Sequence, residues 1–169
     1  MHRYSVPIAL IVCVSCIGLL LTALYMEYVS GLVPCALCLA QRVAFACIGA
    51  AALLYLLPVY RLKLVAGTLV VLSALLGVWL AGRQVWLQSL PEDEVPACGP
   101  DIYFVLDRFP LGESLKTLMM GSGSCAEVQW QFLGLSIPGW TLVWFTLMCI
   151  AGFWLMLFRG ARPFRLFKD

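Results

Sequence analysis

The sequence has 169 residues, of which 63% are hydrophobic and only 12% are charged. Soluble domains carry about 25% charged residues, so this composition excludes an ordinary soluble domain and predicts a membrane protein. The net charge of +2 is small, and no nucleic-acid partner is expected. The single histidine, His2, lies beside the terminus, which excludes an interior Ser-His or Cys-His catalytic pair. Cysteine is therefore the candidate residue for chemistry.

Four apolar runs are each close to the roughly 20 residues that a membrane-spanning helix needs. Arg3 precedes the first run, as in a signal peptide. That run is longer than a usual signal-peptide core and lacks an Ala-x-Ala cleavage site, so we expect an uncleaved span. The predicted spans cover residues 7–25, 42–58, 64–81 and 139–158.

Two loops, at residues 26–41 and 82–138, separate these spans on one side. The longer one is broken repeatedly by proline and glycine, so no long helix or sheet is expected within it. We therefore predict an all-α membrane protein, a four-transmembrane-helix bundle with one long external loop. Residues 1–169 form a single integral membrane domain.

The charges predict which side of the membrane each loop occupies. An even number of spans puts both termini on one side, and that side carries seven of the eleven lysine and arginine residues. The other side carries four, against eight of the nine acidic residues. Because positively charged loops stay in the cytoplasm, both termini are expected to be cytoplasmic and the long loop external.

The eight cysteines divide into two groups under this topology. One group lies within the apolar spans, where a thiolate is costly and a thiol behaves as a small hydrophobic group. We interpret these four as helix-packing residues: Cys13, Cys16, Cys47 and Cys149. The second group lies outside, at the water interface, and is the candidate catalytic set: Cys35, Cys38, Cys98 and Cys125.

Cys35 and Cys38 form a Cys-x-x-Cys motif, and Arg42 follows four residues after the second thiol. A helix beginning near Cys38 puts Cys38 and Arg42 on one face, about one turn apart. The helix dipole and the guanidinium group both favour a thiolate, the reactive form of cysteine.

Other interpretations of these residues stay open. Cys35 and Cys38 could form a structural disulfide at a helix start, and a Cys98–Cys125 bridge could simply stabilise the loop. The four external cysteines could also bind zinc, although zinc ligands usually come as two close pairs. No metal is expected. Arg42 could be an anchor that reaches the lipid headgroups.

The motifs in order resemble those of the DsbB family, the bacterial membrane thiol oxidases that re-oxidise the periplasmic oxidant DsbA. The resemblance covers nearly the whole chain. It rests on residues 34–38 with Arg42, on Cys98 and the Arg108-Phe109-Pro110 segment, on residues 123–130, and on residues 132–135 with Pro138 and Trp140.

The resemblance implies a relay of two cysteine pairs. Cys98 corresponds to the cysteine attacked by the thiolate of the DsbA-like partner, a thioredoxin-fold oxidase, and Cys125 to its disulfide partner in the periplasmic loop. Cys35 and Cys38 correspond to the pair at the membrane edge, with Cys38 next to a quinone. The implied location is the bacterial inner membrane, as a multi-pass protein.

The resemblance also implies a quinone cofactor, either ubiquinone or menaquinone, with Arg42 helping to bind it. Family members often carry a histidine near the quinone, where this chain reads Arg83-Gln84-Val85-Trp86. A neutral amide can still hydrogen-bond to a quinone oxygen, so Gln84 is a second candidate for cofactor binding.

Two rival functions remain open at the level of sequence. One is a quinone- or epoxide-reducing thiol enzyme of the vitamin K reductase type, which also uses a Cys-x-x-Cys motif in a small bundle. In that enzyme the partner would donate electrons, and the useful product would be the reduced quinone and not the disulfide. The other is a non-enzymatic membrane protein whose external cysteines form structural disulfides.

Overall fold

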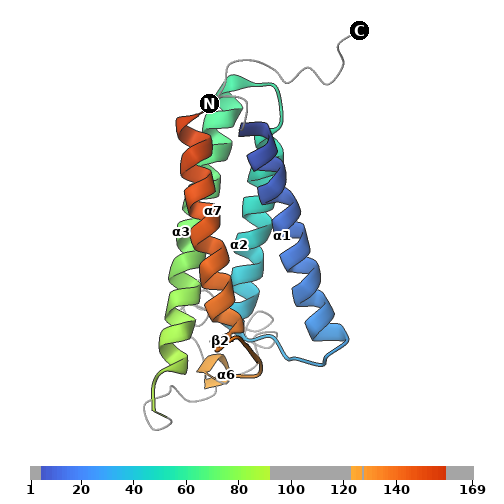
Figure 1. Ribbon diagram of the computed structural model, residues 1–169, viewed down its shortest axis with the longest axis vertical. Helices are drawn as coiled ribbons and strands as arrows, with labels where there is room; N and C mark the ends of the chain where they lie inside the picture. The colour runs from blue at the N-terminus through green and yellow to red at the C-terminus, as the bar shows by residue number, and fades with distance from the viewer. Residues whose placement is uncertain (1–4, 92–122, 127, 159–169) are drawn as a thin grey trace, which may run out of the picture.

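The computed structural model describes residues 5–91, 123–126 and 128–158, and four long helices dominate it (Figure 1). A short helix and a two-stranded hairpin lie together at one end of the bundle, as Figure 1 shows. In chain order the elements are α1 (Ser5–Tyr28), α2 (Ala36–Tyr55), α3 (Tyr60–Gln88), α6 (Gly123–Ala126), β1 (Gln131–Phe132), β2 (Leu135–Ser136) and α7 (Ile137–Leu157).

The four long helices alternate in direction, so that the start of α1 and the end of α7 lie at the same end of the bundle (Figure 1). Each helix is long and apolar enough to cross a membrane. Even α2, with 20 residues, extends about 30 Å, which matches the hydrocarbon thickness of a bilayer. The predicted four-helix membrane bundle is confirmed.

The helix ends follow local sequence signals, with two larger departures from the predicted ranges. The second span was predicted to begin at residue 42, but α2 begins at Ala36, within the predicted loop. α2 ends before Pro58, and Pro138 lies in the first turn of α7, where a missing backbone N–H costs nothing. The third span was predicted to end at residue 81, but α3 continues to Gln88. Gly82 is tolerated within the helix, and the next strong breaker is Pro91.

The β1–β2 hairpin comes directly before α7 in the chain. Its two strands pair antiparallel, with Phe132 opposite Leu135, and leave only Leu133 and Gly134 in the turn. Both turn residues have positive φ, 53° and 78°, as the tightest two-residue hairpin requires. Glycine adopts this conformation readily, whereas leucine does so rarely.

The bundle core is built around α3, which packs against both α2 and α7, while α1 packs mainly on α2. At its centre the rings of Phe45 and Phe145 stack with centroids 4.0 Å apart. A Cβ atom at Gly77 of α3 would lie 2.2 Å from the Phe145 ring, so this glycine allows the close approach. Small residues at contacts of this kind are typical of membrane helix pairs.

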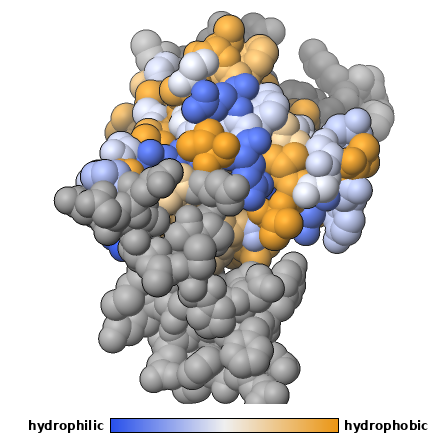
Figure 2. Space-filling model, turned by 90° about the horizontal axis from the view of Figure 1, so that it is seen from below, coloured by the Kyte–Doolittle hydropathy of each residue, from blue (hydrophilic) through white to orange (hydrophobic). Residues whose placement is uncertain are grey.

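The outward faces of the helices expose many large apolar side chains, among them Ile11, Val14, Leu72 and Ile150. Such faces are stable against lipid, not against water. At the end that carries the hairpin, by contrast, hydrophilic residues gather beside apolar ones, as Figure 2 shows. The two described loop elements lie at this end, which is where the candidate site is found.

Candidate functional site

Cys35 and Cys38 lie at the first turn of α2. Cys35 is the N-cap residue, and its Sγ accepts a hydrogen bond from the backbone N–H of Cys38 at 3.3 Å. The Cys-x-x-Cys spacing therefore puts both sulfurs beside the positive end of the helix dipole, which favours negative charge on sulfur. Both are free thiols in this structure.

Gln84 of α3 contacts both of these sulfurs. Its Nε2 lies 3.3 Å from the Sγ atom of Cys35 and 3.3 Å from that of Cys38, and donates to both. The side chain is only 3% exposed. Its predicted contact with a quinone stays a prediction; its observed hydrogen bonds are to the thiols.

Cys125 of α6 joins the same cluster from a distant part of the chain. It is completely buried and packs with Cys35, Leu37 and Leu87, with Cys38 at the edge. A hydrogen bond to Cys125, another to Cys38 and burial together raise the pKa of the Cys35 thiol above its ordinary value. Cys35 is thus in direct contact with thiols on both sides.

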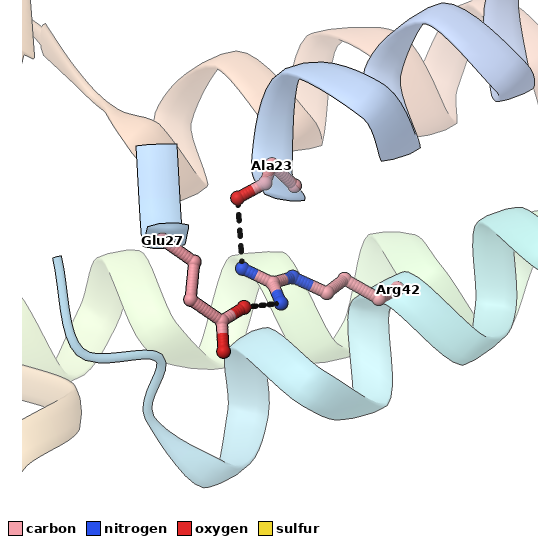
Figure 3. Close-up of polar contacts among 3 residues, drawn as sticks. All are labelled: Ala23, Glu27 and Arg42. Atoms are coloured by element: carbon pink, nitrogen blue, oxygen red, sulfur yellow. Dashed lines mark hydrogen bonds and ion pairs between the residues drawn. The ribbon is translucent and has the colours of Figure 1, made fainter. Parts of the chain in front are cut away.

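Arg42 points from α2 across to the end of α1 (Figure 3). Its Nη1 forms an ion pair with Glu27, and its Nη2 donates to the carbonyl oxygen of Ala23 at 3.2 Å. The side chains of Arg42 and Glu27 are 21% and 19% exposed, so the pair is largely shielded. In this structure the guanidinium group is therefore held by partners within the protein.

A pocket of about 350 Å³ opens beside Cys38 and Arg42. Helices α1, α2, α3 and α7 and the β1–β2 hairpin all contribute to its wall, which is mainly apolar and rich in aromatic rings. Small-molecule sites have this size and this mixture of apolar wall and a few polar groups. The side chains that matter for its chemistry are Glu27, Cys38, Gln41, Arg42, Gln84, Trp130, Trp140 and Trp144.

The structure therefore brings together five of the six predicted site residues: Cys35, Cys38, Arg42, Gln84 and Cys125. The sixth, Cys98, lies outside the described residues. The four cysteines assigned to helix packing lie in the long helices, where Cys16 is buried in the main core and Cys47 is exposed on the outer face of α2. Within the described ranges, no group of three or more His, Cys, Asp or Glu residues could hold a metal ion.

Three site residues were missed by sequence reasoning: Glu27, Gln41 and Thr141. Glu27 carries a signal, because it is the one acidic residue between the first span and the cysteine motif. Gln41 and Thr141 are polar residues within mainly apolar helices, and their hydrogen bonds to partners on other helices distinguish them from ordinary helix positions. Polar residues at such depth are costly without partners, which is the signal that sequence alone offers.

Comparison with known proteins agrees with this geometry. The family described as disulfide bond formation protein DsbB matches residues 5–155. This chain belongs to the DsbB family. Proteins named disulfide bond formation protein B are similar to it over most of both chains. The protein from Marinobacter nauticus is 51% identical over 146 residues, which cover 85% of this chain and 87% of the relative. That from Acinetobacter baumannii is 40% identical over 168 residues, covering 98% and 97%.

Membership of the DsbB family identifies this chain as a multi-pass membrane protein of disulfide bond formation, with disulfide oxidoreductase activity. The predicted family resemblance is confirmed. The cluster of Cys35, Cys38 and Cys125 beside a pocket supplies residues suited to that activity, because disulfide exchange proceeds by attack of one sulfur on another.

Proposed function

We propose that this protein re-oxidises a periplasmic DsbA-like dithiol and passes the electrons through two cysteine pairs to a membrane quinone. The observation that carries the proposal is the position of Cys35. It contacts Cys125, a thiol from the loop, while its neighbour Cys38 lines the pocket. One thiol cluster therefore connects the loop with the pocket.

The first half of the proposed relay takes place in the loop. A thiolate of the partner attacks Cys98 in the Cys98–Cys125 disulfide and releases Cys125 as the leaving thiolate. The partner's second thiol then attacks the mixed disulfide, which leaves the partner oxidised and Cys98 reduced. Two electrons have entered the relay, and two protons have been released from the partner's thiols.

The second half is proposed to use the contact between Cys125 and Cys35. The Cys125 thiolate attacks Cys35 of the Cys35–Cys38 disulfide, which forms a Cys35–Cys125 bond and releases Cys38 as thiolate. Attack of Cys98 on Cys125 then restores the loop disulfide and leaves Cys35 and Cys38 reduced. The contact between Cys125 and Cys35 supports this exchange, because the attacking sulfur already lies beside the sulfur that it attacks.

The pocket suits a planar, largely apolar group with polar oxygens, because aromatic side chains line it and Arg42 supplies N–H donors. Cys38, Arg42 and Trp144 are the residues proposed to hold the quinone. When bound, the quinone accepts two electrons and two protons. Arg42 stabilises negative charge that develops on an oxygen of the ring, and Cys38 presents the reduced sulfur.

A quinone acceptor also agrees with the thermodynamics of the proposed partner. DsbA-type dithiols have reduction potentials near about −120 mV, so their electrons move only to a stronger oxidant. Since roughly 30 mV corresponds to about 1.4 kcal/mol for a two-electron couple, a weak acceptor would stall the relay.

The deciding experiment follows quinone absorbance while the purified protein is mixed with a reduced thioredoxin-fold partner and a soluble quinone. The unaltered chain should reduce the quinone and leave the partner oxidised. Cys125→Ser should abolish quinone reduction, because Cys98 is then a lone thiol and offers the reduced partner no disulfide to attack. Mixed instead with the oxidised partner, the Cys98 thiolate should attack the partner's disulfide and form an adduct that reductant removes. Cys47→Ser is the control, since Cys47 faces outward on the same helix as Cys38.

Other outcomes would contradict the proposal. Quinone reduction by Cys125→Ser at the normal rate would exclude the relay. An adduct formed by Cys35→Ser but not by Cys125→Ser would reverse the order of the two pairs. Reduction of a quinone epoxide, with the partner oxidised in the process, would favour the vitamin K reductase type. Cysteines that stay oxidised without response to quinone would indicate structural disulfides.

A further inference from the structure

Three polar side chains from three different helices form a continuous chain of hydrogen bonds that ends on the thiols. The Thr141 hydroxyl of α7 donates to Oε1 of Gln41 on α2 at 2.8 Å. Nε2 of Gln41 donates to Oε1 of Gln84 on α3, also at 2.8 Å. Nε2 of Gln84 then donates to both Cys35 and Cys38 at 3.3 Å.

Both glutamines are buried, with 4% of Gln41 and 3% of Gln84 exposed. An amide has an acceptor at one end and donors at the other, so the orientation of one amide determines that of the next. Because Gln41 donates to the oxygen of Gln84, the nitrogen of Gln84 must face the sulfurs. Both N–H groups of Gln84 then point at the pair of atoms that exchange electrons.

We propose that Gln84 is a catalytic residue that stabilises negative charge on the Cys35 and Cys38 sulfurs, and that Gln41 is a positioning residue that holds its amide in the donating orientation. The proposal rests on the thiol relay proposed above, because negative charge arises on Cys38 only when the Cys35–Cys38 bond opens. This role of Gln84 acts on the thiols and does not depend on a contact between Gln84 and the quinone.

The physical reason is the low polarity of the cluster. A thiolate buried among Leu37, Leu80 and Leu87 loses its hydration and needs donors from the protein. Hydrogen bonds to charged groups are about twice as strong as neutral ones, so two N–H donors aimed at sulfur favour the thiolate over the thiol. Thr141 contributes less than Gln41, because its hydroxyl also donates to the carbonyl oxygen of Pro138 at 3.0 Å.

The test measures thiolate in the fully reduced protein, without partner or quinone. Iodoacetamide alkylation of Cys38 is followed by mass spectrometry that resolves each cysteine. The quantity compared is the alkylation rate at pH 7 divided by the plateau rate at high pH. This ratio reports the thiolate fraction, and accessibility cancels because it affects both rates.

Gln84→Met should lower this ratio about tenfold, because both donors are lost while the side-chain volume is nearly kept. Gln41→Met should lower it about threefold, because Gln84 can still donate but is no longer held in one orientation. The control is Gln88→Met, the same substitution one turn further along α3. The amide oxygen of Gln88 accepts from Ser136 at 2.7 Å, and this substitution should change the ratio less than twofold.

An unchanged ratio in Gln84→Met would overturn the catalytic assignment, and an unchanged ratio in Gln41→Met would overturn the positioning assignment. An equal decrease in Gln88→Met would also overturn the proposal, because general polarity near the sulfurs would then explain the effect. The alkylation measurement needs no electron acceptor, so it is independent of the quinone assay. The ratio can be unchanged in Gln84→Met although the unaltered chain reduces quinone. It can also fall as expected although the unaltered chain reduces no quinone.

Discussion

At the scale of single residues, the ion pair with Glu27 shows how the charge of Arg42 is held at the membrane edge. A charge at the membrane edge is costly unless it has a partner or a function. Here the guanidinium group is oriented by Glu27 and by the carbonyl of Ala23, and it lines the pocket beside Cys38. Glu27 therefore positions Arg42 without removing it from the site.

Replacing Arg42 should impair use of the proposed quinone and leave use of the proposed protein partner nearly unchanged. Arg42→Met should raise the KM for quinone about tenfold or more, because hydrogen bonds from a charged donor are lost. Arg42→Lys keeps the charge but loses the planar fork, so its effect should be intermediate. Steady-state kinetics with each substrate varied in turn measures both values of KM.

Glu27→Gln is the matched control for this prediction. It removes the carboxylate charge but keeps an oxygen that can accept from Arg42, so the KM for quinone should change less than in Arg42→Met. An Arg42→Met enzyme with unchanged kcat and unchanged KM for quinone would contradict the assignment and leave Arg42 as a membrane anchor.

At the scale of elements, the contact between α3 and α7 depends on glycines that face large side chains. Gly77 lies against the Phe145 ring, and Gly152 of α7 lies against Val70 and Val71 of α3. Gln41 of α2 bonds both to Gln84 of α3 and to Thr141 of α7, so the hydrogen-bond chain at the thiols depends on how these three helices pack.

Gly77→Ala should destabilise the bundle by about 1–3 kcal/mol, because the new methyl group would lie 2.2 Å from the Phe145 ring and push it off the Phe45 stack. Gly82→Ala, on the same helix, is the control. Nothing lies within 4 Å of a Cβ atom there, and alanine is the better helix former, so its stability should stay equal or rise slightly.

Thermal unfolding in detergent, followed by circular dichroism, compares the two variants with the unaltered chain. Equal midpoints for Gly77→Ala and Gly82→Ala would show that the α3–α7 contact tolerates an added methyl group, and the close approach at Gly77 would then have no energetic role.

At the scale of the whole molecule, the arrangement of the helices and the distribution of charge point to one orientation in the membrane. The turn between α1 and α2 lies at the end with the thiol cluster, and the turn between α2 and α3 lies at the opposite end (Figure 1). The lysine and arginine excess falls on that opposite side, which we propose to be cytoplasmic.

Two single cysteines test this orientation in intact cells. Ser30→Cys, in the α1–α2 turn, should increase labelling by a membrane-impermeant maleimide above that of the unaltered chain. Val59→Cys, an exposed position before α3, should increase labelling only after the cells are opened. Neither substitution changes a charge, so the positive-inside signal stays the same. Labelling of Val59→Cys in intact cells would contradict the proposed orientation.

The sequence by itself determined the helices, because each long apolar run leaves its backbone no partner in lipid except its own helix. It also determined the position of the Cys-x-x-Cys pair, since Cys35 and Cys38 follow Pro34 at the start of a helix. The end of α3 was predicted too early, at residue 81, because the charged and polar residues after it were interpreted as a loop, although they are compatible with a helix.

Only the tertiary structure decided which polar groups meet. Gln41 and Gln84 are 43 residues apart, and Gln41 and Thr141 are 100 apart, so no local pattern could pair them. The same holds for Cys125 against Cys35 and for Glu27 against Arg42. A polar side chain in an apolar helix must find a partner, but which partner it finds depends on how the helices pack.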